Sequence, residues 1–131
     1  MSSESTAAPW TGASARSDEL LFTDPDEVFD AVQDTLGRKW HLRIVYQLLE
    51  QGPMGFSALK SEVAGVSSKM LSESLSRLED DGLVDREIVS DQPVRVEYSL
   101  TERGRALEPV VSAVVTWGAE YGPAEAEPEA E

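Results

Sequence analysis

The sequence predicts a mostly α-helical fold with a small β-hairpin, which is an α+β class. Three observations support this prediction. Apolar residues recur at helical spacing from residue 24 to 81, the spacing changes to every second residue between 83 and 100, and helical spacing returns from 101 to 121. With 131 residues, 40% of them hydrophobic, the chain suits one domain with a modest core.

The first predicted helix begins after Asp24, which is a good N-cap and precedes a proline at the first helical position. This helix ends at Gly37. Its apolar face consists of Val28, Phe29, Val32 and Leu36.

A second helix is predicted over residues 38–51, because Gly52 and Pro53 stop it. Its buried side is predicted to hold Trp40, Ile44, Val45, Leu48 and Leu49. A short third helix follows over residues 56–63, with Ser57 as its cap, and leads into a tight turn at residues 64–66.

Ser67 is predicted to cap a fourth helix over residues 68–81, and Gly82 to end it. Leucines at helical spacing form the apolar stripe of this helix: Leu71, Leu75 and Leu78.

Two strands are predicted next, over residues 83–90 and 94–100, joined by a turn at residues 91–93. The second strand alternates, so Val94, Val96, Tyr98 and Leu100 are expected to point inward. Thr101 is predicted to cap the last helix, which runs to about Tyr121. Pro109 predicts a kink or break near Glu108, because proline cannot donate the helical hydrogen bond.

This order of elements is typical of a winged helix-turn-helix, with additional N- and C-terminal helices. The fourth helix is predicted to read DNA bases, because the face opposite its leucines carries small polar groups that can enter a major groove. The alternative is an ordinary solvated helix face. The predicted base-reading residues are Ser67, Ser68, Lys69, Ser72, Glu73, Ser76 and Arg77.

Further DNA contacts are predicted from the third helix, since the first helix of such a motif crosses the backbone, and from the wing. Arg38 and Arg43 are additional phosphate candidates, with solubility as an equal alternative for Arg43. For Arg95 the alternative is a cross-strand pair with Glu87 or Asp85. The predicted phosphate and wing contacts are Lys39, Ser57, Lys60, Gln92 and Arg95.

The last helix carries more apolar surface than one core face requires, so we expect it to pair with a second copy in a homodimer. The alternative is a wide stripe that closes the core of the monomer. The predicted dimer interface comprises Val28, Phe29, Val32, Val110, Val111, Val114, Trp117 and Tyr121.

Charge is distributed unevenly along the chain, whose net charge is −14. Residues 1–37 carry −7 and residues 106–131 carry −6, whereas residues 38–105, which hold the predicted DNA-binding elements, carry −1. We expect a flexible acidic arm over residues 1–23, a folded domain over 24–121 and a disordered acidic tail over 122–131. An excess of acidic residues with few lysines is also typical of proteins that stay soluble in concentrated salt, so we hypothesise a haloarchaeal source. The alternative is an acidic mesophilic protein.

Composition excludes several classes of site. The chain has no cysteine, which excludes disulfides, thiolate metal sites and thiol redox sensing. Its single histidine, His41, is expected to be a packing or surface residue and cannot form a zinc site alone. We predict no metal, no cofactor and no enzymatic activity. Neither a secretory signal nor a membrane-length apolar run is present, so a cytoplasmic protein without a membrane partner is expected.

Residues 36–117 resemble the HxlR-type winged-helix regulators, a MarR/PadR-like family. The resemblance rests on GRKW before the second helix, GPMGF before the third, KML in the fourth, LEDDGLV at its end and VEYSLT in the second strand. It implies a homodimeric repressor or activator on a pseudo-palindromic operator, with terminal helices forming the interface.

Three departures from the family pattern matter. Gly55 stands where the family usually has an arginine, which removes one candidate phosphate contact, and Val94 replaces one of two wing prolines. Many relatives sense oxidants or aldehydes through an N-terminal cysteine, and that mechanism does not carry over to a chain without cysteine.

The sequence therefore predicts a sequence-specific transcription regulator that binds double-stranded operator DNA as a homodimer. The alternative is a winged helix that serves as a protein-interaction module without reading DNA directly, which the near-neutral charge of residues 38–105 favours. The operator, the controlled genes and any small-molecule effector are not specified by the sequence.

Overall fold

The computed structural model describes residues 24–122, and contacts divide the chain into two units, Met1–Asp34 and Thr35–Glu131. The described part of the first unit belongs to helix α2 (Pro25–Leu36), and the second unit contains all later elements. The arm predicted over residues 1–23 and nearly all of the predicted tail lie outside the described residues.

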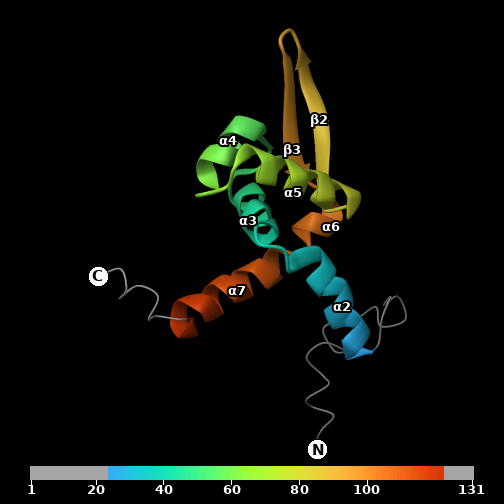
Figure 1. Cartoon of the computed structure of the whole chain (residues 1–131), viewed down its shortest axis with the longest axis vertical. Helices are drawn as coiled ribbons and strands as arrows, with labels where there is room; N and C mark the ends of the chain where they lie inside the picture. The colour runs from blue at the N-terminus through green and yellow to red at the C-terminus, as the bar shows by residue number, and fades with distance from the viewer. Residues whose placement is uncertain (1–23, 123–131) are drawn as a thin grey trace, which may run out of the picture. The chain divides into compact units, whose positions relative to one another are not determined.

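The fold class predicted from the sequence is confirmed, and Figure 1 shows its elements. After α2 the chain forms α3 (His41–Gln51), β1 (Met54–Gly55), α4 (Phe56–Glu62), α5 (Ser68–Asp80), β2 (Val84–Asp91), β3 (Val94–Leu100), α6 (Glu102–Arg105) and α7 (Glu108–Tyr121). Within the second unit, the β2–β3 hairpin projects beyond α4 and α5 as a wing (Figure 1).

Side-chain caps define the starts of three helices, and all three were predicted. Asp24 Oδ1 accepts a hydrogen bond from the Asp26 amide at 3.1 Å at the start of α2. Ser67 Oγ accepts from the Met70 amide at 3.0 Å, and Thr101 Oγ1 accepts from the Gly104 amide at 3.0 Å. Each cap satisfies an amide that has no partner inside its helix.

One predicted helix start and one predicted cap were wrong. Helix α3 begins at His41 and not at residue 38, because residues 38–40 form the turn that separates it from α2. Ser57 does not cap α4: Gly55 occupies the N-cap position and Ser57 lies inside the helix. Phe56 already starts this helix, since strand β1 ends at Gly55.

A three-stranded antiparallel sheet with the order β1–β3–β2 replaces the simple hairpin that the sequence predicted. Strand β1 is only two residues long and pairs Met54 with Tyr98 and Gly55 with Glu97. The inward orientation predicted for Val94 was wrong, because this side chain is 67% exposed. It lies near the tip of the projecting hairpin, where there is no core to enter, whereas Leu100 at the base is buried.

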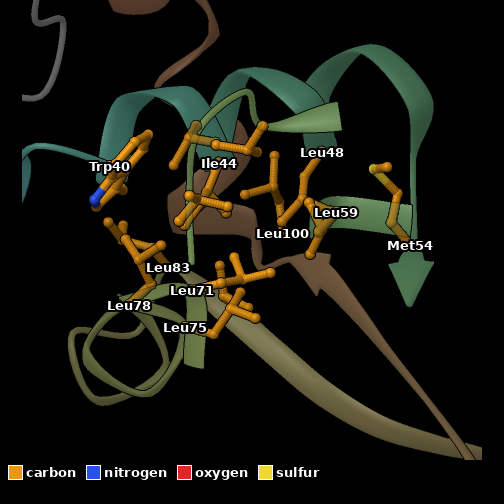
Figure 2. Close-up of a cluster of buried hydrophobic side chains, with 14 of the residues drawn as sticks. Trp40, Ile44, Leu48, Met54, Leu59, Leu71, Leu75, Leu78, Leu83 and Leu100 are labelled. Carbon is orange, nitrogen blue, oxygen red and sulfur yellow. The ribbon is translucent and has the colours of Figure 1, made fainter. Parts of the chain in front are cut away.

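The core forms where α3, α4 and α5 meet the base of the sheet (Figure 2). Figure 2 shows Trp40 and Met54 at opposite ends of this cluster, with leucines of α3, α4 and α5 between them. His41 is 1% exposed, and its Nδ1 donates to the Thr35 carbonyl oxygen at 2.7 Å, so this histidine is a packed core residue. The buried hydrophobic residues are Trp40, Ile44, Val45, Leu48, Met54, Leu59, Val63, Val66, Leu71, Leu75, Leu78, Leu83, Val84, Leu100 and Val111.

The break predicted near Glu108 is confirmed, because α6 ends at Arg105 and α7 starts at Glu108 with Pro109 in its first turn. Helix α6 is tied to the base of the hairpin by side chains. Thr101 Oγ1 donates to the Gly82 carbonyl at 2.7 Å, and Arg105 donates to the Leu100 carbonyl at 2.8 Å. Arg103 donates to the Asp81 carbonyl. These bonds join α6 to the end of α5 and to the base of the wing.

We expect Gly104→Ala to destabilise the protein by about 1–3 kcal/mol, the usual cost of overpacking a filled site. A Cβ atom at Gly104 would overlap the carbonyl oxygen of Leu83 and press on Leu100. Gly118→Ala in α7 is the matched control: its Cβ would meet nothing within 4 Å, so a stabilisation of about 0.5–1 kcal/mol is expected. Urea unfolding followed by circular dichroism measures both changes, and equal effects of the two substitutions would contradict the packing described for Gly104.

Candidate functional site

The connection between α4 and α5 fixes how α5 is presented. Val63 and Val66 are both buried on either side of Gly65, so the turn is anchored in the core at two points. Gly65 has a φ of +87°, a left-handed conformation that favours glycine. The chain therefore leaves α4, reverses within a few residues and enters α5 at the cap formed by Ser67.

Helix α5 is divided into a buried side and an exposed side. Leu71, Leu75 and Leu78 are buried, as the leucine stripe predicted, and Ser74 joins them at 6% exposure, which the sequence analysis missed. A serine among leucines gives no apolar signal, so only packing shows its burial. The residues predicted to read bases are all exposed: Ser67, Ser68, Lys69, Ser72, Glu73, Ser76 and Arg77.

The two charged residues at the centre of the exposed side form an ion pair. Lys69 Nζ lies 2.5 Å from Glu73 Oε2, one helical turn away, and both side chains are solvent-exposed. The hydrogen bond to Glu73 and the negative charge of Glu73 raise the pKa of Lys69, so the ammonium group stays charged at neutral pH. With its charges paired, this side of α5 presents a small, polar and nearly neutral surface.

The predicted phosphate and wing residues are also exposed, and they come from separate elements. Lys39 precedes α3, Ser57 and Lys60 lie on α4, and Gln92 and Arg95 lie at the tip of the hairpin. Lys39 Nζ lies 4.9 Å from the ring centroid of Trp40, and the Arg43 guanidinium lies 5.3 Å from the same centroid. These cation–π contacts place two cations beside a buried tryptophan.

The strand register settles the cross-strand alternative for Arg95. Arg95 lies opposite Ser90, whereas Glu87 lies opposite Glu97 and Asp85 opposite Ser99. The register therefore contradicts the alternative that Arg95 forms a cross-strand pair with Glu87 or Asp85. The register is shifted by an irregularity between Ile88 and Ser90, which alternation along one strand cannot reveal.

Helix α7 leaves a large apolar surface uncovered within the described residues. Trp117 and Tyr121 are 62% and 69% exposed, and their ring centroids lie 6.2 Å apart. Val110 and Val114 are exposed on the same side of the helix. Val111, which was also predicted to lie at the dimer interface, differs, because it is buried in the core and is not part of this exposed surface. Helix α2, taken by itself, exposes Phe29 and Val32 and half-buries Val28.

Two kinds of feature are absent from the part of the chain that the structure describes. Residues 24–122 contain no group of three or more His, Cys, Asp or Glu side chains placed to hold a metal ion. None of the helices in that range has the length and apolar character needed to span a membrane.

The sequence matches known proteins over most of its length. A family model described as HxlR-like helix-turn-helix matches residues 35–126. The chain is 41% identical over 94 residues to the uncharacterized HTH-type transcriptional regulator YdzF of Bacillus subtilis, an alignment that covers 72% of this chain and 86% of the relative. It is 39% identical over 93 residues to the uncharacterized HTH-type transcriptional regulator YvaP of the same species, covering 71% of this chain and 85% of the relative.

Solved structures of similar proteins share the fold. The reduced form of the transcriptional regulator YodB from B. subtilis has a TM-score of 0.65 at 31% identity, covering 76% of this chain and 95% of YodB. The redox regulator HypR in its oxidized form has a TM-score of 0.66 at 36% identity, covering 70% of this chain and 94% of HypR. A MarR-family regulator from Porphyromonas gingivalis W83 has a TM-score of 0.68 at 28% identity, covering 78% and 99% of the two chains.

We expect Glu73→Gln to lower the pKa of Lys69 toward the ordinary lysine value, because the substitution removes the negative charge that stabilises the ammonium. The Lys69–Glu73 pair persists below the raised pKa and is lost as pH rises through it. An NMR pH titration of the Lys69 side chain measures the shift. Glu79→Gln, an exposed glutamate on the same helix, is the control; if both variants leave the pKa of Lys69 unchanged, the pair does not form in solution.

Proposed function

The chain belongs to the HxlR-like helix-turn-helix family, and from this premise we propose that it is a sequence-specific regulator that binds a pseudo-palindromic operator as a homodimer. Its relatives are HTH-type transcriptional regulators, so the chain is a DNA-binding regulator and not an enzyme. The observation that carries the finer proposal is the exposed, small and polar side of α5 beside the projecting wing.

Reading of bases is proposed for the N-terminal half of α5. A major groove about 12 Å wide admits a helix, and the exposed serines, Ser68, Ser72 and Ser76, add little bulk to this side. Lys69 can donate to guanine, and Glu73 can accept from the N4 amino group of cytosine. Their pairing at 2.5 Å means that both must exchange partners when they meet bases.

Residues outside α5 are proposed to contact the DNA backbone and so to position the protein on the duplex. Ser57 and Lys60 on α4 suit phosphate contacts, because the first helix of the motif crosses the backbone. Lys39 supplies a further cation at the start of α3. Gln92 and Arg95 at the hairpin tip are proposed to lie along the minor groove or on a phosphate beside it.

The charge of the proposed DNA-binding region favours sequence-specific contacts over sequence-independent attraction to DNA. Residues 38–105, which hold every proposed DNA contact, carry a net charge of −1. The surrounding acidic residues oppose the attraction of these cations to the phosphates, so we expect the sequence-independent affinity to be small. Discrimination must come from base contacts and DNA shape.

The homodimer is proposed to cover the apolar side of α7. Four of its exposed residues, Val110, Val114, Trp117 and Tyr121, recur at helical spacing. A protein of this size gains by burying such a surface against a second copy, and two-fold pairing would present two α5 helices to one duplex. The exposed residues of α2, Phe29 and Val32, are proposed to be covered in the same dimer.

The competing function is a protein-interaction module that does not read DNA. It is favoured by the near-neutral charge of residues 38–105 and by the internal pairing of Lys69 with Glu73. If substitutions in α5 alone abolish DNA binding, the DNA-reading function is supported over the protein-interaction module.

We expect Lys69→Ala/Ser72→Ala to weaken operator binding by at least about thirtyfold, because each of the two lost base contacts costs about 1–3 kcal/mol. Genome-wide mapping of bound sites in the native host supplies the operator, and fluorescence anisotropy measures the affinity. Gln47→Ala/Gln51→Ala on α3 is the control, with both residues outside the proposed contacts. A folded Lys69→Ala/Ser72→Ala protein with unchanged affinity would remove α5 as the reading helix.

We expect Val114→Glu to convert the dimer to a monomer, because it places a charge within the apolar side of α7 that would otherwise be buried. Ala119→Glu is the control, since helical geometry places Ala119 about opposite the stripe. Sedimentation velocity gives the mass and circular dichroism confirms folding. A dimeric Val114→Glu protein would show that α7 does not form the interface.

A further inference from the structure

The ion pair between Lys69 and Glu73 stands where helix stability does not explain it. Its side chains are 78% and 57% exposed, and an exposed pair of this kind contributes little to folding. Lys69 lies in the first turn of α5, where the helix dipole favours acids, and no acid occupies that turn. Lysine before glutamate is also the less favourable order for a pair one turn apart. The reason for the pair therefore lies outside the helix, on the side that α5 leaves exposed.

The serines around this pair can satisfy almost any base edge. A hydroxyl both donates and accepts a hydrogen bond, so Ser68, Ser72 and Ser76 suit donors and acceptors alike. An ammonium group only donates, and an ionised carboxylate only accepts. At the centre of the exposed side of α5, discrimination between bases therefore falls to Lys69 and Glu73.

The two charges make opposite demands on the major groove. Its acceptors are N7 and O6 of guanine, N7 of adenine and O4 of thymine, and its donors are the amino groups N4 of cytosine and N6 of adenine. In a G·C pair the guanine acceptors adjoin the cytosine amino group, so an ammonium and a carboxylate can both be satisfied side by side. In an A·T pair the amino group lies between two acceptors, which repel a carboxylate that approaches it. G·C is thus the base pair that matches these two charges.

Leaving the ion pair for DNA has a cost that depends on the sequence. Lys69 Nζ and Glu73 Oε2 lie 2.5 Å apart, so each must give up its partner to meet a base. Where the groove offers acceptors and an amino donor together, new contacts replace the old one. Where it offers acceptors alone, the carboxylate loses water and gains no partner. Its negative charge also offsets the attraction of Lys69 to phosphates of any sequence.

We propose that Glu73 is a specificity-determining residue of α5: with Lys69 it selects one G·C pair in each half-site, and it lowers affinity for DNA that has no cytosine at that place. This inference rests on the proposed function, because it requires α5 to lie in the major groove. It goes further by assigning one base pair to both residues and by giving the carboxylate a rejecting role. Such a penalty against wrong sequences complements attraction to the right one.

Replacing Glu73 by glutamine tests the assignment. Glutamine has nearly the shape of glutamate, carries no charge and pairs with N6 and N7 of adenine. We expect Glu73→Gln to reduce the ratio of operator affinity to non-operator affinity by about tenfold or more, mainly because non-operator DNA binds more tightly. Selection of bound duplexes from a random library by the full chain should show the preference at one position per half-site moving from G·C toward A·T.

Two further variants complete the test. Glu79→Gln makes the same change of charge at an exposed residue near the end of α5, and it should keep both the affinity ratio and the selected sequence. Lys69→Ala should lose the preference for guanine at the same base pair that Glu73→Gln changes. Circular dichroism checks that each variant is folded.

The outcomes separate this inference from the proposed function. If the unmodified protein binds DNA and Glu73→Gln keeps its sequence and its ratio, the role of Glu73 is refuted and the regulator function stands. An equal effect of Glu79→Gln would reduce the result to overall charge and refute that role as well. Changes at different base pairs in Lys69→Ala and Glu73→Gln would refute joint reading. An unmodified protein that binds no duplex in the library refutes the proposed function and this inference with it.

Discussion

Burial of the leucine stripe of α5 is the contact on which the rest of the molecule depends. Leu71, Leu75 and Leu78 pack into one cluster with residues of α3, α4 and the base of the sheet. Because a helix has a fixed period, burying these three positions determines which side chains remain outside. The same packing anchors the start of the wing through Leu83 and Val84, so helix and wing are set by one core.

That constraint produces two neighbouring surfaces around one helix. The outer side of α5 is polar and internally neutralised by the Lys69–Glu73 pair. The flank toward residues 37–41 is a cationic cavity that shares Glu73 and Arg77 with it.

Much of the candidate site could be predicted from the sequence, because the residue patterns that indicate it lie close together along the chain. Helix caps at Asp24, Ser67 and Thr101, the break before Pro109 and the polar side of α5 depend on residues within a turn or two of each other. The motifs that resemble the family lie in the same segments, and the family match over residues 35–126 agrees with them.

The sequence by itself determined the order of the elements, the face of α5 left polar and the apolar excess of α7. Only the tertiary structure decided what distant segments do to each other: the pairing of Met54 with Tyr98, the register that places Arg95 opposite Ser90, and the burial of Ser74 and Val111. Periodicity reports the neighbours along a chain, whereas strand register and burial depend on contacts between residues far apart in sequence, and no local pattern encodes those.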